Sequence, residues 1–502
     1  MNERNKRLFN NTFSSLALQI TTIISGFILP KLIIAHYGSN TNGLINSITQ
    51  FLGVITLLDL GMGAVVQSSL YKPLSDNDSS QISRIYVSAS RFFKRIAYIL
   101  TLYIVALIIL YPTIINNSYS FIYTATLIAS IGISSFLQYY FGIVNTIILR
   151  ADQKGYLQYN INILTIILNT ITSCFLIYFE FPIQIIKLST SIIYAIRPIY
   201  LYLYVRGHYL IDTKIIYKEE PIKQKWNGIA QHLAYYVLES TDSIVLTIFS
   251  SLENISIYSV YNNIIMGVKN ALLSMTNGFQ SLLGEMIAKK KTEKLNNFFG
   301  YVEWILHTGT TLVFGCTGVL LISFVKVYTN GITDADYIQP LFAVLITVAN
   351  AGHCLRLPYN TLILAAGHYK QTQSNYIIAM ILNIVISIAT VKIWGLVGVA
   401  IGTLVAMIYQ TVWMAWYDSK NIINWPFKNF LKQSGVDITT VIIASLVTFK
   451  IPMLSVSYSA WIVQALEVFI CWLIIVLLVN YILYKGKISF LLGKIKHKIA
   501  RS

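Results

Sequence analysis

The segment from Phe13 to Leu70 reads FSSLALQITTIISGFILPKLIIAHYGSNTNGLINSITQFLGVITLLDLGMGAVVQSSL. Two long apolar runs in it flank a short polar turn at His36–Asn42. Each run is long enough to cross about 30 Å of hydrocarbon at about 1.5 Å per residue. The stretch therefore predicts a membrane hairpin.

Three features inside this hairpin are unusual for a lipid-embedded segment. Pro30 removes one backbone hydrogen bond and is a candidate hinge. Lys31 places a cation next to it, well inside the first apolar run. Asp59, followed by Gly61 and Gly63, places a carboxylate and two glycines expected to allow close packing late in the second run. Charges at such depth are costly, so they indicate a transport pathway or a pairing role.

The composition is that of an integral membrane protein. Of 502 residues, 55% are hydrophobic and 11% are charged, and the mean hydropathy is +0.63. The four cysteines fall inside apolar runs without zinc-ligand or CxxC spacing, so we expect no disulfide framework and no metal site. The net charge of +17 does not indicate a nucleic-acid partner, because the basic residues lie between the runs.

Fourteen apolar runs predict fourteen helices, of which 433–449 is the shortest and carries Asp437. We expect an N-terminal lobe over 1–205 and a cytoplasmic linker over 206–226. A C-terminal lobe over 227–418 would follow, and then two further helices and a basic cytoplasmic tail over 419–502. The runs lie at 11–35, 43–68, 96–115, 121–147, 157–179, 183–204, 227–250, 256–285, 298–325, 338–365, 374–391, 397–416, 433–449 and 460–483.

The basic residues orient this topology. One set of alternate connections, with both termini, holds 29 of the 37 Lys and Arg residues, and the opposite set holds three. Because cytoplasmic loops are enriched in Lys and Arg, both termini should be cytoplasmic. The outer connections are short, and the chain has no P-loop, HExxH or GxSxG motif. We therefore expect no catalytic residues and no enzyme activity.

An internal repeat organises the chain. Residues 148–169 read ILRADQKGYLQYNINILTIILN, and residues 363–383 read ILAAGHYKQTQSNYIIAMILN. With one gap the two segments align from a helix end through a basic polar turn into Ile-Leu-Asn of the next helix. They lie about six helices apart, so the sequence predicts two six-helix lobes in parallel repeat.

Charged residues inside the runs are the candidate functional residues. Lys269 lies nearest the middle of a run and should face water or an anion, and Arg356 lies beside Pro358. Arg197 precedes Pro198, and anchoring on an aromatic ring is its structural alternative; Pro30, Pro198 and Pro358 are candidate hinges. A convergence of Lys31, Lys269 and Arg356 would require the two lobes to face each other across a cavity.

The acidic candidates are Asp59, Glu239 and Asp242. Glu239 and Asp242 are three residues apart on one helix face, where they would bind a coupling cation or pair with Lys31 or Lys269. Glu285 and Glu303 lie near predicted inner helix ends and should be interfacial.

Several segments resemble the polysaccharide-repeat flippases of the MOP superfamily. These segments are LPKLIIAHYGSNTNGLINS followed by LLDLGMG, TDSIVLTIFSSLENISIYSVYNNI, and the polar turn after the fourth run. The resemblance implies a MATE-like fold with a central cavity. It also implies export of undecaprenyl-diphosphate-linked oligosaccharide to the outer leaflet of a bacterial plasma membrane by alternating access.

In this reading Lys31, Lys269, Arg356 and Arg197 bind the diphosphate or acidic sugars. Asp59, Glu239 and Asp242 are candidate coupling or gating residues. No cofactor is expected, and a proton or sodium gradient could drive the cycle. The partners would be the lipid-linked glycan, membrane lipids, and polysaccharide polymerase and chain-length machinery, with no nucleic acid. The alternatives are a lipid II flippase, a multidrug or cation antiporter of the same superfamily, and a membrane glycan polymerase or ligase.

Overall fold

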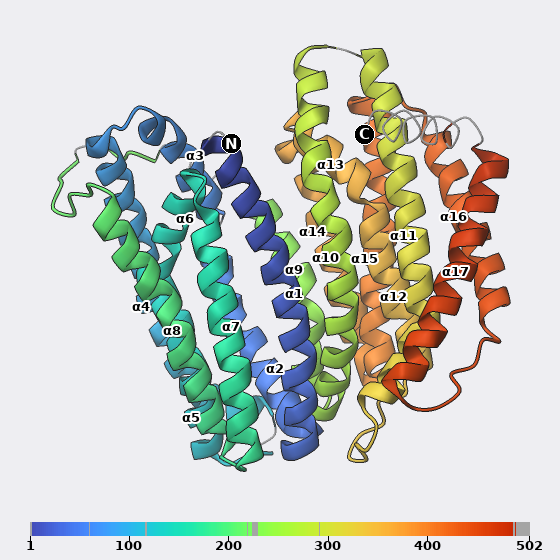
Figure 1. Cartoon of the computed structure of the whole chain (residues 1–502), viewed down its shortest axis with the longest axis horizontal. Coiled ribbons are helices and arrows are strands. Elements are labelled where there is room, and N and C mark those ends of the chain that lie inside the picture. The colour runs from blue at the N-terminus through green and yellow to red at the C-terminus, as the bar shows by residue number, and fades with distance from the viewer. Residues whose placement is uncertain are drawn as a thin grey trace. The chain divides into compact units, whose positions relative to one another are not determined.

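The computed structural model places helices on all fourteen predicted runs (Figure 1). It describes residues 3–59, 61–115, 118–217, 219–222, 229–290, 292–484 and 487, so most of the predicted basic tail lies outside the described residues. Over this part of the chain, eleven helices and one bent pair are long and apolar enough to span a membrane. The helices α9 and α10, which carry Glu239, Asp242 and Lys269, are not among them.

The chain forms two compact units, Met1–Ser256 and Ile257–Ser502. The predicted lobes divide at 206–226 instead, and those boundaries stay a prediction. The helices of the first unit are α1 Glu3–Tyr37, α2 Ser39–Gly53, the 3-10 helix η1 Val54–Asp59, α3 Met62–Ser75, α4 Ser79–Ile114, α5 Phe121–Leu137, the π-helix η2 Gln138–Gly142, α6 Ile143–Ala151, α7 Gly155–Tyr178, α8 Ile183–His208 and α9 Ile229–Phe249.

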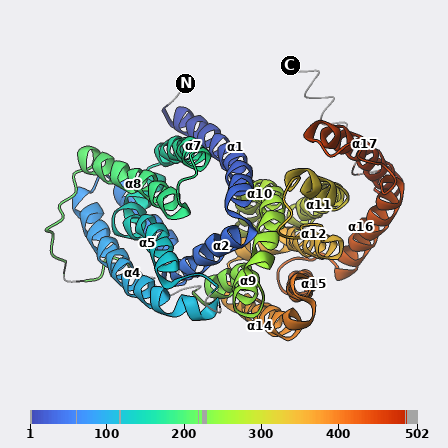
Figure 2. The same cartoon turned by 90° about the horizontal axis from the view of Figure 1, so that it is seen from below.

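The second unit contains most of α10 and all the helices after it. Within it, α16 and α17 pack on α11 as an adjoining pair, as Figure 2 shows from below. Its helices are α10 Leu252–Ala288, α11 Thr292–Tyr328, α12 Pro340–Leu355, α13 Leu357–Ala366, α14 Tyr369–Trp394, α15 Leu396–Asn421, α16 Phe427–Thr448 and α17 Tyr458–Leu483.

The second helix of the opening hairpin is broken. It passes from α2 into η1, and α3 begins after Gly61, whose φ of 71° is left-handed and suits glycine. A Cβ on Gly63 would meet Ile147 only at an ordinary 3.8 Å. Close packing at this glycine pair is therefore not what the structure shows, and Gly61 supplies a turn instead.

The packing order repeats between the two units. In the first unit α5 packs against α4 and α8, and α8 packs against α7. In the second unit α12 packs against α11 and α15, and α15 packs against α14. These are the third to sixth helices of each predicted set, so the arrangement supports the parallel repeat.

The two aligned turns have the same backbone hydrogen bond, from an N–H to the carbonyl five residues earlier. The N–H of Lys154 donates to the carbonyl of Leu149 at 2.7 Å, and the N–H of His368 donates to the carbonyl of Ile363 at 3.2 Å. The residue before each has a positive φ, 57° at Gln153 and 73° at Gly367. Both turns are therefore Schellman helix ends, each followed at once by the next helix.

Buried asparagines continue the match into the next helix. Asn169 on α7 donates to the hydroxyl of Tyr194 on α8 at 3.4 Å, and Asn383 on α14 donates to the hydroxyl of Thr403 on α15 at 2.9 Å. The sequence repeat thus corresponds to a repeat of helix end, turn and interhelical hydrogen bond.

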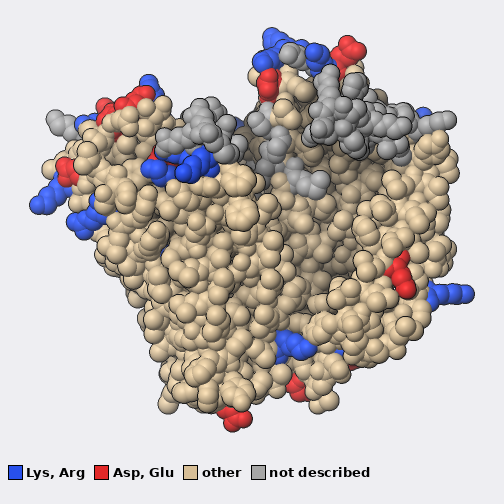
Figure 3. Space-filling view, in the orientation of Figure 1, with Lys and Arg blue, Asp and Glu red and all other residues tan. Residues whose placement is uncertain are grey.

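Within the first unit, segments that the sequence assigns to one membrane side lie together. At one end, Asn11 donates to the carbonyl of Gln153 at 2.8 Å, and the charge pattern predicts both to lie inside. At the other end, Tyr37 donates to the carbonyl of Phe181 at 2.5 Å, and the same pattern predicts both to lie outside. In Figure 3 most charged side chains in view gather toward the upper and lower edges, and most of the surface between them is uncharged. The chain is a multi-pass membrane protein, and the cytoplasmic placement of its termini stays a prediction.

The last two helices are held by a buried tryptophan. Trp472 of α17 is fully buried, and its indole N–H donates to Thr448 of α16 at 3.1 Å. A Cβ on Gly315 of α11 would lie 1.9 Å from the Trp472 ring, so only glycine allows this approach. The shortest predicted run, 433–449, is therefore part of a packed, membrane-length helix.

Candidate functional site

Arg197 of α8 borders a polar pocket inside the first unit. The pocket holds about 450 Å³ and is lined by α2, η1, α5, η2, α6, α7 and α8. The guanidinium carbon lies 3.7 Å from the centre of the Tyr194 ring, and Nε donates to Thr165 Oγ1 at 2.6 Å. The expected ring anchoring is therefore present. Its buried Nη2 has no hydrogen-bond partner among the described residues, so one donor remains for a ligand.

Amide and hydroxyl groups complete this pocket. They can exchange hydrogen bonds with a hydroxyl-rich ligand, while Arg197 supplies positive charge. Pro198 is buried next to Arg197, where a Cβ on Gly142 would approach its ring at 3.0 Å. The polar lining includes Thr49, Ser134, Gln138, Gln158 and Asn162.

The other candidates of the first unit lie on α1, η1 and α9. Lys31 is half-buried directly after Pro30, which α1 accommodates within the helix, and Asp59 is the last residue of η1. Glu239 is half-buried on α9, and Asp242 on the same helix is 6% exposed. Their coupling or gating role stays a prediction.

Helix α9 and the start of α10 pack on α2 through small and polar groups. A Cβ on Gly43 would lie 1.8 Å from the carbonyl oxygen of Leu252, so the two backbones touch at a glycine. The hydrogen bonds across it are Asn42 Nδ2 to Ser256 Oγ at 2.8 Å and Ser47 Oγ with Thr247 Oγ1 at 2.9 Å.

In the second unit the structure brings two predicted cations to one histidine. Lys269 of α10 and Arg356 are each 2% exposed, and the charges of both act on His353 of α12. Arg356 lies between α12 and α13, and its Nη2 is 3.1 Å from His353 Nδ1. Pro358 lies in the first turn of α13 and has no N–H to donate there.

Arg356 retains unused hydrogen-bonding capacity. Its Nε and Nη1 are buried and have no partner in the part of the chain that the structure describes. A buried guanidinium with unsatisfied donors is costly, and an anion bound beside it would offset that cost. The cluster of Lys269, His353 and Arg356 is therefore the strongest candidate anion site within one unit, and the role of each residue stays a prediction.

The sequence-based expectation for Glu303 is wrong. The sequence predicts an interfacial residue, but Glu303 is 2% exposed on α11 and accepts hydrogen bonds from Tyr359 and Trp425. Glu285, by contrast, is exposed and pairs with Lys289, as an interfacial residue would. The spacing of Glu303 and His307 could have predicted this buried site. The two residues are four apart, so they share one helix face inside an apolar run.

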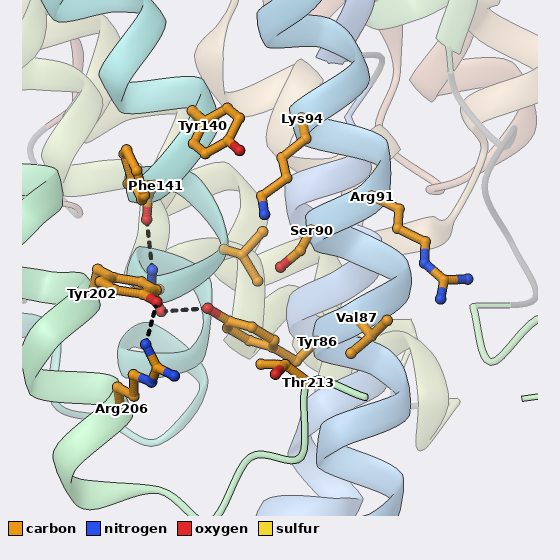
Figure 4. Close-up of a pocket in the computed structure, with 12 residues that line it drawn as sticks. Tyr86, Val87, Ser90, Arg91, Lys94, Tyr140, Phe141, Tyr202, Arg206 and Thr213 are labelled. Atoms are coloured by element: carbon orange, nitrogen blue, oxygen red, sulfur yellow. Dashed lines mark hydrogen bonds between the residues drawn. The ribbon is translucent and has the colours of Figure 1, made fainter. Parts of the chain in front are cut away.

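A second pocket lies where α4, η2, α6 and α8 meet (Figure 4). It holds about 340 Å³, and Figure 4 shows Lys94 reaching toward Tyr140 and Arg206 lying beside Tyr202. The Lys94 ammonium is 4.8 Å from the Tyr140 ring centre, and Arg206 donates to the Tyr202 hydroxyl at 2.9 Å. Basic side chains paired with tyrosines are typical of a membrane interface.

No protein-family model and no curated protein matches the sequence. Solved structures do match its fold. The lipid II flippase MurJ in an inward closed conformation matches with a TM-score of 0.68 at 16% identity, over 95% of this chain and 100% of that chain. A multidrug resistance MATE family transporter of the MOP superfamily, inward-facing, matches with a TM-score of 0.63 at 14% identity, over 80% of this chain and 95% of that one.

The Vibrio cholerae MATE transporter VcmN in its bent form matches with a TM-score of 0.54 at 14% identity, over 85% of this chain and 97% of that one. At these identities the likeness is one of fold. The chain thus has the all-helical fold of MOP superfamily membrane transporters.

Proposed function

We propose that the chain is a flippase that moves undecaprenyl-diphosphate-linked oligosaccharides from the inner to the outer leaflet of a bacterial plasma membrane by alternating access. The observation that carries this proposal is the extent of the fold match. The match to the lipid II flippase covers 95% of this chain, and the match to the MATE transporter covers 80%.

The buried cations support an anionic substrate. Arg356 keeps two unused donors and Arg197 one, and Lys269 shares the His353 environment of Arg356. A lipid diphosphate needs such donors while it crosses hydrocarbon. A cationic drug would be repelled by them, so these residues favour the flippase over a multidrug or cation antiporter.

The glycan portion needs polar, hydroxyl-binding walls. The pocket beside Arg197 offers amides, hydroxyls and the ring of Tyr194. The lipid tail would remain in the bilayer. Polysaccharide polymerase and chain-length proteins are the proposed partners, because they would act on the exported units.

A lipid II flippase is the second candidate, favoured by the match in fold to MurJ. Depleting the protein in its host separates the two. A repeat-unit flippase leaves the cell wall intact and loses surface glycan, whereas a lipid II flippase causes wall failure and lysis. Glycosyltransferase genes beside the gene would favour the repeat-unit flippase.

Replacing Lys269 tests the anion site. Lys269→Ala should abolish surface-glycan export and leave membrane abundance near normal, because a buried cation is costly to the fold but useful to an anionic ligand. Lys269→Arg should retain part of the export, since charge persists while shape changes. Surface glycan and membrane abundance are measured together by immunoblot.

The matched control is Lys450→Gln, a charge loss at an exposed residue beyond α16. Normal export by Lys269→Ala would remove Lys269 from the anion site. A variant that fails to accumulate until Glu239→Gln or Asp242→Asn is added would instead assign Lys269 to a structural pair.

A further inference from the structure

A buried chain of hydrogen bonds joins α11, α13 and α16 in the second unit. Tyr359 of α13 donates to Glu303 Oε1 at 2.7 Å, and its hydroxyl is 3.2 Å from His307 Nε2. On the other side of the ring, His307 Nδ1 is 2.7 Å from Asp437 Oδ2. Glu303, His307 and Tyr359 are each at most 2% exposed, and Asp437 is 6% exposed. The four side chains therefore form one continuous path inside the membrane-spanning part of the unit.

The two ends of this path are held in place. Trp425 donates its indole N–H to Glu303 Oε2 at 3.0 Å, and Gln433 donates to Asp437 Oδ1 at 3.1 Å. Each carboxylate thus has one oxygen fixed by a donor outside the path. Its other oxygen is left to the Tyr359 hydroxyl or to the imidazole. Fixed outer donors keep the path aligned whichever atom holds the mobile proton.

Counting protons gives two fully hydrogen-bonded arrangements. In the first, a doubly protonated His307 donates to Asp437 and to the Tyr359 oxygen, and the Tyr359 O–H donates to an ionised Glu303. In the second, His307 Nε2 has lost its proton and accepts from Tyr359, while a protonated Glu303 donates to the Tyr359 oxygen. The N–H bond of His307 breaks as a new Tyr359 O–H bond forms, and the former Tyr359 proton goes to Glu303.

Removing one proton from either arrangement breaks the path. A neutral His307 still donates to Asp437 and accepts from Tyr359, and Glu303 then keeps Trp425 as its donor but loses Tyr359. The site therefore has distinct loaded and unloaded states.

Other ionisable groups surround the path. Asp418 of α15 is 1% exposed, and neither of its carboxylate oxygens has a hydrogen-bond partner among the described residues. Lys487 donates to the carbonyl of Gly300 at 2.9 Å, and the positive charge of Lys432 repels that of Lys487. Burial raises the pKa of Tyr484 to about 12, so that hydroxyl keeps its proton at physiological pH.

We propose that Glu303, Tyr359, His307 and Asp437 form a site that binds one proton, passes it between His307 and Glu303 through the Tyr359 hydroxyl, and couples proton movement to transport. The coupling of proton movement to transport rests on the proposed function, whereas the binding of a proton at this site does not. The site ties α16, which lies outside the six-helix repeat, to α11 and α13. Loading and unloading would therefore make and break the Tyr359–Glu303 hydrogen bond between α13 and α11, while the His307–Asp437 hydrogen bond to α16 persists.

Trp425 provides a direct optical probe of Glu303. The purified full-length protein is titrated from acid to alkaline pH, and its tryptophan fluorescence is compared with that of Trp425→Phe to isolate the Trp425 signal. The wild type should show a single-proton transition in that signal. Glu303→Gln should remove it, and Tyr359→Phe, which keeps the ring, should move its midpoint by about one pH unit, a tenfold change in proton affinity. Glu285→Gln is the matched control and should leave it unchanged.

The proton site is overturned if the wild type shows no transition or if Glu303→Gln leaves the transition unchanged. It is also overturned if Asp418→Asn loses the transition while Glu303→Gln retains it. Displacement of the midpoint by sodium at constant ionic strength would overturn it as well. Infrared detection of a protonated carboxyl that disappears in Glu303→Gln should agree, and gives the answer if fluorescence of that variant is altered by misfolding. A clear transition in a protein that exports no lipid-linked glycan would uphold the proton site and refute the proposed function.

Discussion

The fourth helix of each repeated set is interrupted, but the two interruptions differ in chemistry. In the first unit, α5 passes through the π-helix η2, and its Tyr139 and Tyr140 line two separate pockets. In the second unit, α12 gives way to α13 at Arg356 and Pro358. Irregular turns inside helices are frequent at functional sites. The repeat has kept the place of the interruption and changed its side chains.

The cations follow the same pattern. The second unit has its arginine at the interruption, where two of its nitrogens lack partners among the described residues. The first unit has Arg197 on the sixth helix of its set, with the Tyr194 ring and Thr165 already engaged. We therefore expect Arg356 to neutralise more of an anionic ligand's charge than Arg197 does.

The largest expected effect follows from this contrast. Arg356→Gln should reduce export more than tenfold, because lost hydrogen bonds to a charged ligand are worth about 1.5–3 kcal/mol and each 1.4 kcal/mol is about tenfold. Arg197→Gln should reduce it by a smaller factor. Both variants should accumulate, since glutamine keeps a hydrogen-bonding side chain and removes a buried charge that is costly to desolvate. Export is measured as surface glycan per unit of membrane protein, and an equal or reversed order would break the comparison.

A smaller effect is expected at the two Schellman turns. Gly367 has a φ of 73° and open space where a Cβ would lie, so Gly367→Ala should destabilise the protein by about 1 kcal/mol through backbone strain alone. Gln153 has the same left-handed backbone, and Gln153→Gly should be neutral or stabilising by a few tenths of a kcal/mol.

Thermal unfolding of the purified protein in detergent measures both changes. Gly435→Ala is the matched control, because Gly435 lies inside α16 with open space around it, and alanine there should stabilise by about 1 kcal/mol. If Gly367→Ala stabilises as Gly435→Ala does, the two turns do not share the left-handed geometry on which the repeat rests.

The sequence predicts the helices well because lipid imposes long apolar runs on them. It also predicts the repeat, because the turns at 148–169 and 363–383 keep their polar residues in order and the structure gives them the same closure. It does not predict the bend at Gly61. A glycine in an apolar run reads equally as a packing residue or as a turn.

The proton site is beyond sequence reasoning for a different reason. Its members come from α11, α13 and α16, and Glu303 and Asp437 are separated by more than a hundred residues. Each reads alone as a residue near a helix end. Only Glu303 and His307, four residues apart, give a local signal. Tertiary packing, absent from the sequence pattern, brings the rest together.

Transfer of the proposed substrate between leaflets is measured in vesicles that contain the purified protein and a fluorescent undecaprenyl-diphosphate oligosaccharide in the membrane. A reagent that cannot cross the membrane and that destroys the label reports how much lipid lies in the accessible leaflet over time. Nearly all of the label should become accessible with the wild type and about half with protein-free vesicles, because unassisted transfer of the charged headgroup is blocked. Arg356→Gln should approach the wild-type level more than tenfold more slowly. Equal accessibility with and without the wild-type protein would contradict it.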